Sequence, residues 1–245
     1  MILQWHVFLE GTPDPGTRYI DWLLSGLSWT VALALSAWVI ALLLGVAVGI
    51  ARTWPNRWAS LVGNAYVELF RNIPLLVQLF LWYFVLPELV PKAIGDWIKS
   101  VAPPWGPFFT AVICLSFFTS ARIAEQVRAG IGALPRGQKN AALAMGMSLG
   151  QAYRLVLLPQ AMRLIVPPLT SEFMTIFKNS SVALTIGLLE LTAQAKQMNE
   201  FTFKTYEAFG AATVLYLVTA MVVNRGMAWV ERRSRVPGYA SQGGH

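Results

Sequence analysis

The chain has 245 residues, of which 56% are hydrophobic and 13% are charged, and its formal net charge is +7. Because an ordinary soluble domain carries about 25% charged residues, this composition indicates a protein that is solvated largely by lipid. The single cysteine, Cys114, lies in an apolar run, and the two histidines, His6 and His245, lie near the chain ends. These positions exclude a disulfide framework and a Cys/His metal site.

Five segments are apolar over the length that a helix needs to cross a bilayer, about 20 residues. They cover residues 22–51, 63–87, 105–130, 160–189 and 207–230. The first is free of charge, whereas the second includes Glu68 and Arg71, and the fourth is interrupted by Pro167 and Pro168. The sequence therefore predicts an all-α, polytopic membrane protein that forms one domain over residues 1–245. The first 16 residues lack the features of a secretory signal, so we expect them in the mature protein.

Lys and Arg residues, which are retained on the cytoplasmic side of a membrane, concentrate in three segments. These segments cover residues 52–57, 122–163 and 225–235. Their separation along the chain favours a membrane face over nucleic acid as the origin of the positive charge. We therefore expect the N-terminus outside and the C-terminus inside, as five spans require. Residues 122–163 would form the largest cytoplasmic element, with its loop over residues 131–158.

The loop is rich in strong helix formers from Gln138 to Leu149, with Gly146 and Gly150 as the expected breaks. This pattern predicts a short helix, a turn, and a second helix that enters the membrane. Leu143 and Met147 fall on one side of the short helix. By pattern alone, that side suits either lipid headgroups or a protein partner.

The loop resembles the EAA signature of the permeases of bacterial type I ABC importers. Its spacing is Ala141-Ala142, three residues, Gly146, nine residues, Val156, one residue, and Leu158-Pro159, and Asn140 stands where the family usually has Glu. Three further segments resemble the polar amino acid permeases, and among these most closely the glutamate/aspartate permeases. They are ELFRNIPLLVQLF from Glu68, ARIAEQVRAGIGALPRGQ before the loop, and KNSSVALTIG from Lys178.

The resemblance implies a subunit of an ATP-driven importer in the bacterial inner membrane, and not an enzyme. It implies four protein or ligand partners besides the lipid bilayer: a second permease, identical or related, cytoplasmic ATP-binding subunits, a periplasmic binding protein and a polar amino acid. The chain contains no GxxxxGK[ST] phosphate loop. We therefore expect no cofactor on this chain, with ATP and Mg held by the partner ATPase.

The same resemblance assigns the contact with the ATPase to the loop. The expected coupling residues are Asn140, Ala141, Ala142, Gly146, Leu158 and Pro159. Small side chains at Ala141, Ala142 and Gly146 would let the helix backbone approach its partner closely. Asn140 carries one charge fewer than the usual Glu, but asparagine is a good N-cap for the short helix.

Polar residues at membrane depth require a partner because their burial in lipid is costly. Glu68 and Arg71 lie three residues apart and are expected to neutralise each other, and the competing interpretation is that some of these charged residues line the translocation path. The predicted substrate pathway comprises Gln78, Glu172, Lys178, Asn179, Ser180 and Ser181. Gln78 has no local ionic partner, so it would bond either across helices or to substrate. Lys178 suits an anionic side chain, and its extension to the outer surface is the competing interpretation.

Two other functions fit a polytopic membrane protein. An ion-coupled secondary carrier would normally show an internal repeat with paired broken helices, which the sequence does not display. A membrane scaffold without transport activity would not explain the polar residues of the fourth segment. The importer permease is therefore the predicted function.

Overall fold

The computed structural model describes residues 4–234, without the side chains of Arg136 and Ser234. Arg235 and His245, which entered the sequence argument, lie outside the described residues. The helices in chain order are η1 (Trp5–Leu9), α1 (Tyr19–Thr53), α2 (Arg57–Asn72), α3 (Leu75–Phe80), η2 (Leu81–Val85), α4 (Leu86–Leu89), α5 (Lys92–Ser100), α6 (Trp105–Gly132), α7 (Arg136–Ala144), α8 (Leu149–Ala152), η3 (Tyr153–Leu157), α9 (Leu158–Asn179), η4 (Ser180–Ile186), α10 (Leu191–Thr202) and α11 (Thr205–Ser234). The predicted all-α fold is confirmed.

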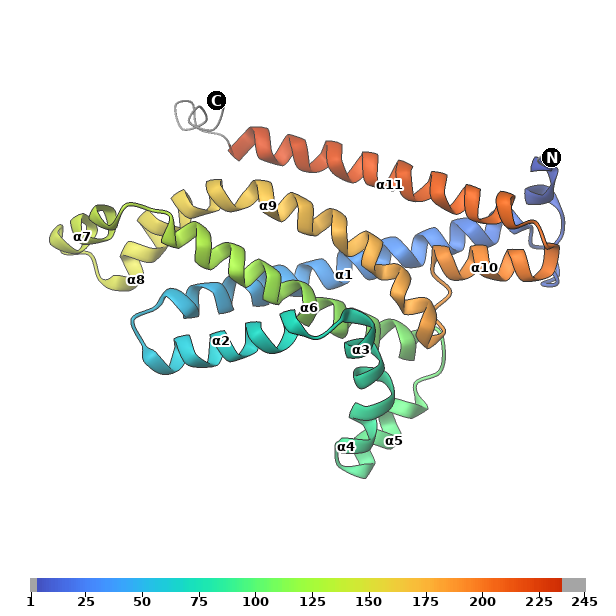
Figure 1. Cartoon of the computed structure of the whole chain (residues 1–245), viewed down its shortest axis with the longest axis horizontal. Helices are drawn as coiled ribbons and strands as arrows, with labels where there is room; N and C mark the ends of the chain where they lie inside the picture. The colour runs from blue at the N-terminus through green and yellow to red at the C-terminus, as the bar shows by residue number, and fades with distance from the viewer. Residues whose placement is uncertain (1–3, 235–245) are drawn as a thin grey trace.

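The long helices α1, α6, α9 and α11 run along the long axis of the molecule, and α2 lies beside α6 (Figure 1). The hairpin of α4 and α5 projects to one side of this bundle (Figure 1). The start of α1 and the end of α11 lie at opposite ends of the long axis (Figure 1). The short helices α7 and α8 lie at the end where α11 finishes (Figure 1).

Helix α6 is the centre of the bundle, because it packs against α1, α2 and α9. The contact with α1 is close because α1 presents small, buried residues at every fourth position, which lets two helix backbones approach. These residues are Ala37, Ala41, Gly45 and Gly49. A Cβ atom on Gly49 would lie 2.5 Å from the Cβ of Val127. Glycine is therefore required at this crossing.

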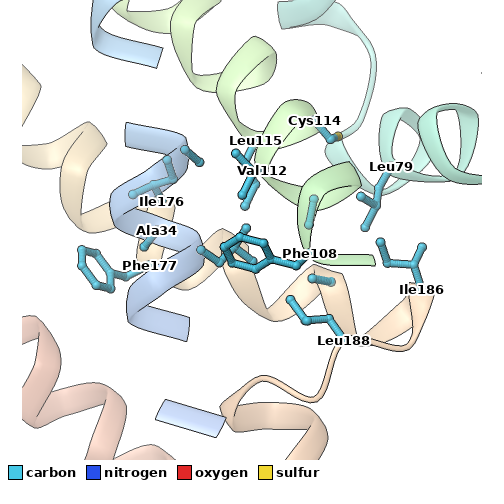
Figure 2. Close-up of a cluster of buried hydrophobic side chains, with 14 residues drawn as sticks. Ala34, Leu79, Phe108, Val112, Cys114, Leu115, Ile176, Phe177, Ile186 and Leu188 are labelled. Carbon is cyan, nitrogen blue, oxygen red and sulfur yellow. The ribbon is translucent and has the colours of Figure 1, made fainter. Parts of the chain in front are cut away.

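A large cluster of the core includes the middle of α1 and the first half of α6. Figure 2 shows its apolar side chains converging from α1, α3, α6 and the end of α9 with the segment after it. Ala34, Leu115 and Ile176 are among the fully or almost fully buried members of this cluster. The cluster joins segments that are more than one hundred residues apart in the chain.

Three described helices are long and apolar enough to cross a membrane: Tyr19–Thr53, Trp105–Gly132 and Thr205–Arg233. The pair Arg57–Asn72 and Leu75–Leu89 qualifies only together, and it bends by 102° at the break. Residues 63–87 therefore fall in helices on both sides of a sharp bend, and the expectation that they form one span stays a prediction. Helix α9, which covers most of the predicted fourth span, is not among these candidate helices. It carries Arg163, Glu172 and Lys178.

Several local expectations for the loop and its flanks are corrected by the helix bounds. Arg122 and Arg128 lie inside α6, so they are not part of a cytoplasmic loop. Asn140 lies in the middle of α7 and is exposed, so it does not cap that helix. The chain does break at Gly146, as predicted, but Gly150 lies within α8. The second helix begins after Ser148 instead, whose hydroxyl accepts a hydrogen bond from the backbone N–H of Gln151.

Candidate functional site

The end of α7 forms a compact turn that depends on Gly146. Gly146 has φ of +84°, in the left-handed region, where a side chain is strained. Its N–H donates to the carbonyl of Leu143, and the N–H of Met147 donates to that of Ala142. These two bonds satisfy the last carbonyls of the helix in the Schellman arrangement. A Cβ on Gly146 would meet no atom of this chain within 4 Å. Within the chain, position 146 therefore favours glycine because of its backbone conformation and not because of lack of space.

The other predicted coupling residues divide into exposed and packed groups. Asn140 and Ala141 are exposed on α7, whereas Ala142 is buried within its own chain at 4% exposure. Pro159 is exposed in the first turn of α9, and Leu158 packs partly on the core cluster beneath the loop. Within the chain, the surface open to a partner therefore includes Asn140, Ala141 and Pro159 but not Ala142.

Tyr153 connects the coupling loop to the end of α1, a link that the sequence did not reveal. Its hydroxyl donates a hydrogen bond of 2.7 Å to the carbonyl of Thr53, and its ring lies 4.9 Å from that of Trp54 between centroids. A π-helical turn begins at Tyr153. The backbone N–H of Leu158 closes this turn by donating a hydrogen bond to the carbonyl of Tyr153. This wider turn precedes Pro159, which has no N–H to continue a regular helix.

The α2–α3 bend is stabilised by Gln78. Pro74 has no N–H, so the carbonyl of Phe70 loses its normal helical donor four residues later. The side-chain Nε2 of Gln78 donates to this carbonyl and to that of Ile73, each at 2.8 Å. Gln78 is 2% exposed. Of the two expected alternatives, the structure shows the bond across helices, because Gln78 on α3 donates to the carbonyl of Phe70 on α2. Whether it also contacts substrate stays a prediction.

Glu68 and Arg71, expected to neutralise each other, do not form an ion pair in the described part of the chain. Both side chains are exposed on α2. The residues lie on the turns just before the bend at Pro74, where Ile73 leaves the helical conformation. The pairing inferred from their spacing alone is therefore wrong.

Glu172 lies in the interior of the bundle and is held by two residues of α6. Arg122 donates from Nε to Oε2 of Glu172 at 2.8 Å, and Gln126 donates from Nε2 to Oε1 at 3.0 Å. A charge at membrane depth costs about 2.5–3.5 kcal/mol on insertion scales, and such residues face a partner or a water-filled cavity. The partners of Glu172 therefore come from α6 and not from the polar run that follows it.

A second ion network ties α1, α2 and α6 together. Arg52 donates from Nη1 to Oε2 of Glu125 and from Nε to Oδ1 of Asn64, each at 2.7 Å. Arg128 pairs with the other oxygen of Glu125. The side chain of Arg52 is only 9% exposed. Its contacts with two helices at once indicate a structural role.

The four polar residues at the junction of α9 and η4 do not form one cluster. Lys178 and Ser181 line a cavity of about 330 Å³ together with Thr192 and Tyr216. Asn179 lines a separate and much smaller pocket, which includes residues of α3 and α6. The hydroxyl of Ser180 is buried and donates to the carbonyl of Phe177. These residues therefore divide between two faces of the helix.

Sequence reasoning missed a buried carboxylate beside the larger cavity. Glu190 is fully buried and caps α10, because its oxygens accept bonds from the backbone N–H groups of Thr192 and Ala193. The hydroxyl of Tyr216 on α11 donates to the same carboxylate at 2.9 Å. The signal in the sequence was an acidic residue directly before a helix, which is a common N-cap.

Residues 41–236 match the model of a protein family described as the inner membrane component of binding-protein-dependent transport systems. The chain belongs to this family. It is therefore a multi-pass inner-membrane permease, and the ATPase and the binding protein are separate partners in such systems. Its relatives are transporter subunits and not enzymes.

The permease is similar to relatives from other bacteria over nearly its whole length. It is 51% identical over 236 residues to the glutamate/aspartate import permease protein GltJ of Escherichia coli (strain K12), with 96% of each chain covered. It is 32% identical to the probable glutamine ABC transporter permease protein GlnM of Bacillus subtilis (strain 168), over 90% of this chain and 94% of that one. The predicted resemblance to polar amino acid permeases is confirmed.

Two solved structures share the fold. The structure of an amino acid ABC transporter with histidines matches at a TM-score of 0.74 and 32% identity, over 88% of this chain and 95% of that one. An inward-facing form of the MetNI methionine ABC transporter matches at a TM-score of 0.74 and 21% identity, over 92% and 100%. The arrangement of helices in the permease is thus that of ABC importer permeases.

Proposed function

We propose that the chain is the permease subunit of an ATP-driven importer for glutamate and aspartate. The observation that carries this proposal is the 51% identity to a glutamate/aspartate import permease across 96% of both chains. A periplasmic binding protein delivers the amino acid to the outer face. A second permease, identical or related, completes the pathway, and cytoplasmic ATPase subunits bind ATP and Mg.

The distribution of charge supports an N-terminus in the periplasm and a C-terminus in the cytoplasm. Arg57 opens α2, Arg154 lies in η3 and Arg232 lies near the end of α11. All three elements reach the end of the bundle that carries α7 (Figure 1). Positive side chains are retained on the cytoplasmic side, where the ATPase docks.

The coupling loop supports a path from the ATPase to the membrane helices. Helix α7 inserts into a groove of the ATPase. Asn140, Ala141 and Pro159 lie on the exposed surface of this chain that is available for the contact. The bond between Tyr153 and the carbonyl of Thr53 carries the movement to α1. The same loop continues directly into α9. Movement of α7 therefore shifts two spans together, as rigid-body switching requires.

The polar residues of α9 support two positions for contact with the amino acid. Lys178 and Ser181 line the larger cavity, and Asn179 faces the α3 side. A cation at the cavity edge suits an acidic side chain, and neutral hydrogen-bonding groups suit the amino and carboxyl groups. Asn179→Ala and Ser181→Ala should each lower uptake at limiting substrate while the complex still assembles and hydrolyses ATP.

The test is uptake into proteoliposomes that contain the complete complex with its binding protein. Labelled glutamate and aspartate should enter only when ATP is present on the side of the membrane that carries the ATPase subunits. Unlabelled glutamate should compete for uptake better than unlabelled histidine or glutamine. Uptake that survives ATP depletion and stops when an ion gradient is collapsed would instead indicate a secondary carrier. Failure of glutamate and aspartate to compete would overturn the substrate assignment.

A further inference from the structure

The inner half of α6 presents a polar face that is unlike the lipid-facing surfaces of the bundle. Helices α1 and α11 expose large apolar side chains along their length, such as Leu43 and Val222. On the described surface of α6, exposed large apolar residues occur only in the outer half, up to Ile113. Beyond that point the exposed positions of this helix are Arg122, Arg128, Ala129 and Gly132. A face without large apolar groups does not suit lipid and suits a water-filled pathway.

Arg122 lies on this face within the candidate membrane span Trp105–Gly132. It is about 15 Å along the helix from the inner end of α6 at Gly132. Its side chain is 43% exposed, whereas that of Glu172, its partner on α9, is 9% exposed. In this pair, the cation lies at the surface of the bundle and the anion lies in its interior.

The hydrogen bonds around this pair leave two guanidinium nitrogen atoms of Arg122 available, and they also leave the buried Oε1 of Gln126 without a partner among the described residues. Both oxygens of Glu172 are occupied, one by Nε of Arg122 and one by Nε2 of Gln126. Among the described residues, no hydrogen bond or ion pair engages Nη1 or Nη2 of Arg122. A guanidinium presents two parallel N–H groups to a carboxylate, a geometry that lysine lacks.

Arg52 shows what a purely structural arginine looks like in the same molecule. Its side chain is 9% exposed, and Nε and Nη1 both bond within the bundle, to Asn64 and Glu125. Arg122 uses Nε alone and presents its terminal nitrogen atoms. The two arginines differ in exposure and in donor use, although each is paired with a buried or partly buried glutamate.

We infer that Arg122 contacts a carboxylate of the amino acid in the pathway, with Glu172 and Gln126 positioning its guanidinium. The inference rests on the proposed function and deepens it, because it names the group that selects an acidic substrate. The paired Glu172 keeps the guanidinium extended towards the pathway. A dicarboxylate offers this cation one more carboxylate than a neutral amino acid does.

The experiment uses the complete importer in proteoliposomes with saturating, glutamate-loaded binding protein. ATP-dependent glutamate uptake by the unaltered permease comes first, and its absence would overturn the proposed function and not this inference alone. Arg122→Gln should then lower the uptake rate at least 10-fold, with basal ATP hydrolysis retained. The double variant Arg122→Gln with Glu172→Gln should stay equally slow, because it restores charge balance without restoring the anion contact.

A structural role predicts a different pattern. If Arg122 only neutralises Glu172, the double variant should recover to within about twofold of the unaltered rate, and this would overturn the inference. Unchanged uptake by Arg122→Gln would overturn it too, as would failure of the charge-balanced double variant to assemble. The matched control is Arg128→Gln, since Arg128 lies on the same helix, is 46% exposed and pairs with a glutamate. That variant should keep uptake within about twofold.

Discussion

The replacement Gln78→Leu tests the structural account of the α2–α3 bend. It removes the donor that serves the carbonyls of Phe70 and Ile73, each at 2.8 Å, in a site where Gln78 is 2% exposed. An unsatisfied buried carbonyl costs about 1–3 kcal/mol, so two of them cost about 2–6 kcal/mol together, and the loss of the buried Oε1 of Gln78, which has no partner among the described residues, offsets part of this cost. For a chain of this size, 1 kcal/mol corresponds to about 2–4 °C in Tm. Taking the lower part of the range, Tm should fall by about 4–12 °C.

The same reasoning predicts coupling between Gln78 and Pro74. The replacement Pro74→Ala returns an N–H at position 74, which can serve the carbonyl of Phe70 when the side chain of Gln78 is absent. Gln78→Leu should therefore cost less in the Pro74→Ala background than in the unaltered permease, by about 1 kcal/mol or more. Leucine is apolar and similar in size, so loss of packing volume contributes little.

The measurement is thermal unfolding in detergent of the unaltered permease, Gln78→Leu, Pro74→Ala and the double variant. Unfolding is monitored as the fraction of protein that remains monodisperse after heating. A fall of less than about 2 °C for Gln78→Leu would refute the claim that its side chain supplies the donor missing at Pro74. An equal fall in both backgrounds would refute the coupling. Selective loss of uptake with unchanged Tm would instead place Gln78 in contact with substrate.

Three further predictions concern the helix contacts and the loop. Gly49→Ala should lower Tm, because overpacking costs about 1–3 kcal/mol, whereas Gly210→Ala, in open space on α11, should leave it unchanged or raise it; thermal unfolding compares the two. Ala141→Leu should reduce co-purification of the ATPase without reducing membrane insertion. Gly146→Ala should also reduce the amount of bound ATPase, because alanine strains the backbone at this left-handed position, and Gly146→Asn should reduce it less. Tyr153→Phe should keep the ATPase bound but lower the stimulation of ATP hydrolysis by loaded binding protein, and full stimulation would exclude the proposed link to α1.

The sequence by itself determined the class of the protein and the nature of the loop, because both depend on local patterns. Runs of about 20 apolar residues predict membrane helices whatever they pack against. Helix formers up to Ala144 followed by Gly146 predict a short helix and a break, and both are present. The short motifs around residues 68–80, 121–138 and 178–187 predicted the family, since a motif is read without knowledge of its neighbours in space.

The partners of the polar residues were decided only by the tertiary structure. Spacing paired Glu68 with Arg71, but α2 exposes both, and Glu172 found its partner Arg122 fifty residues away on another helix. Helical rotation separated Lys178 from Asn179, which line different cavities although they are adjacent in the chain. A buried charge is stabilised by whichever group the packing of helices brings within hydrogen-bonding distance, and hydropathy and spacing along one helix do not contain that information.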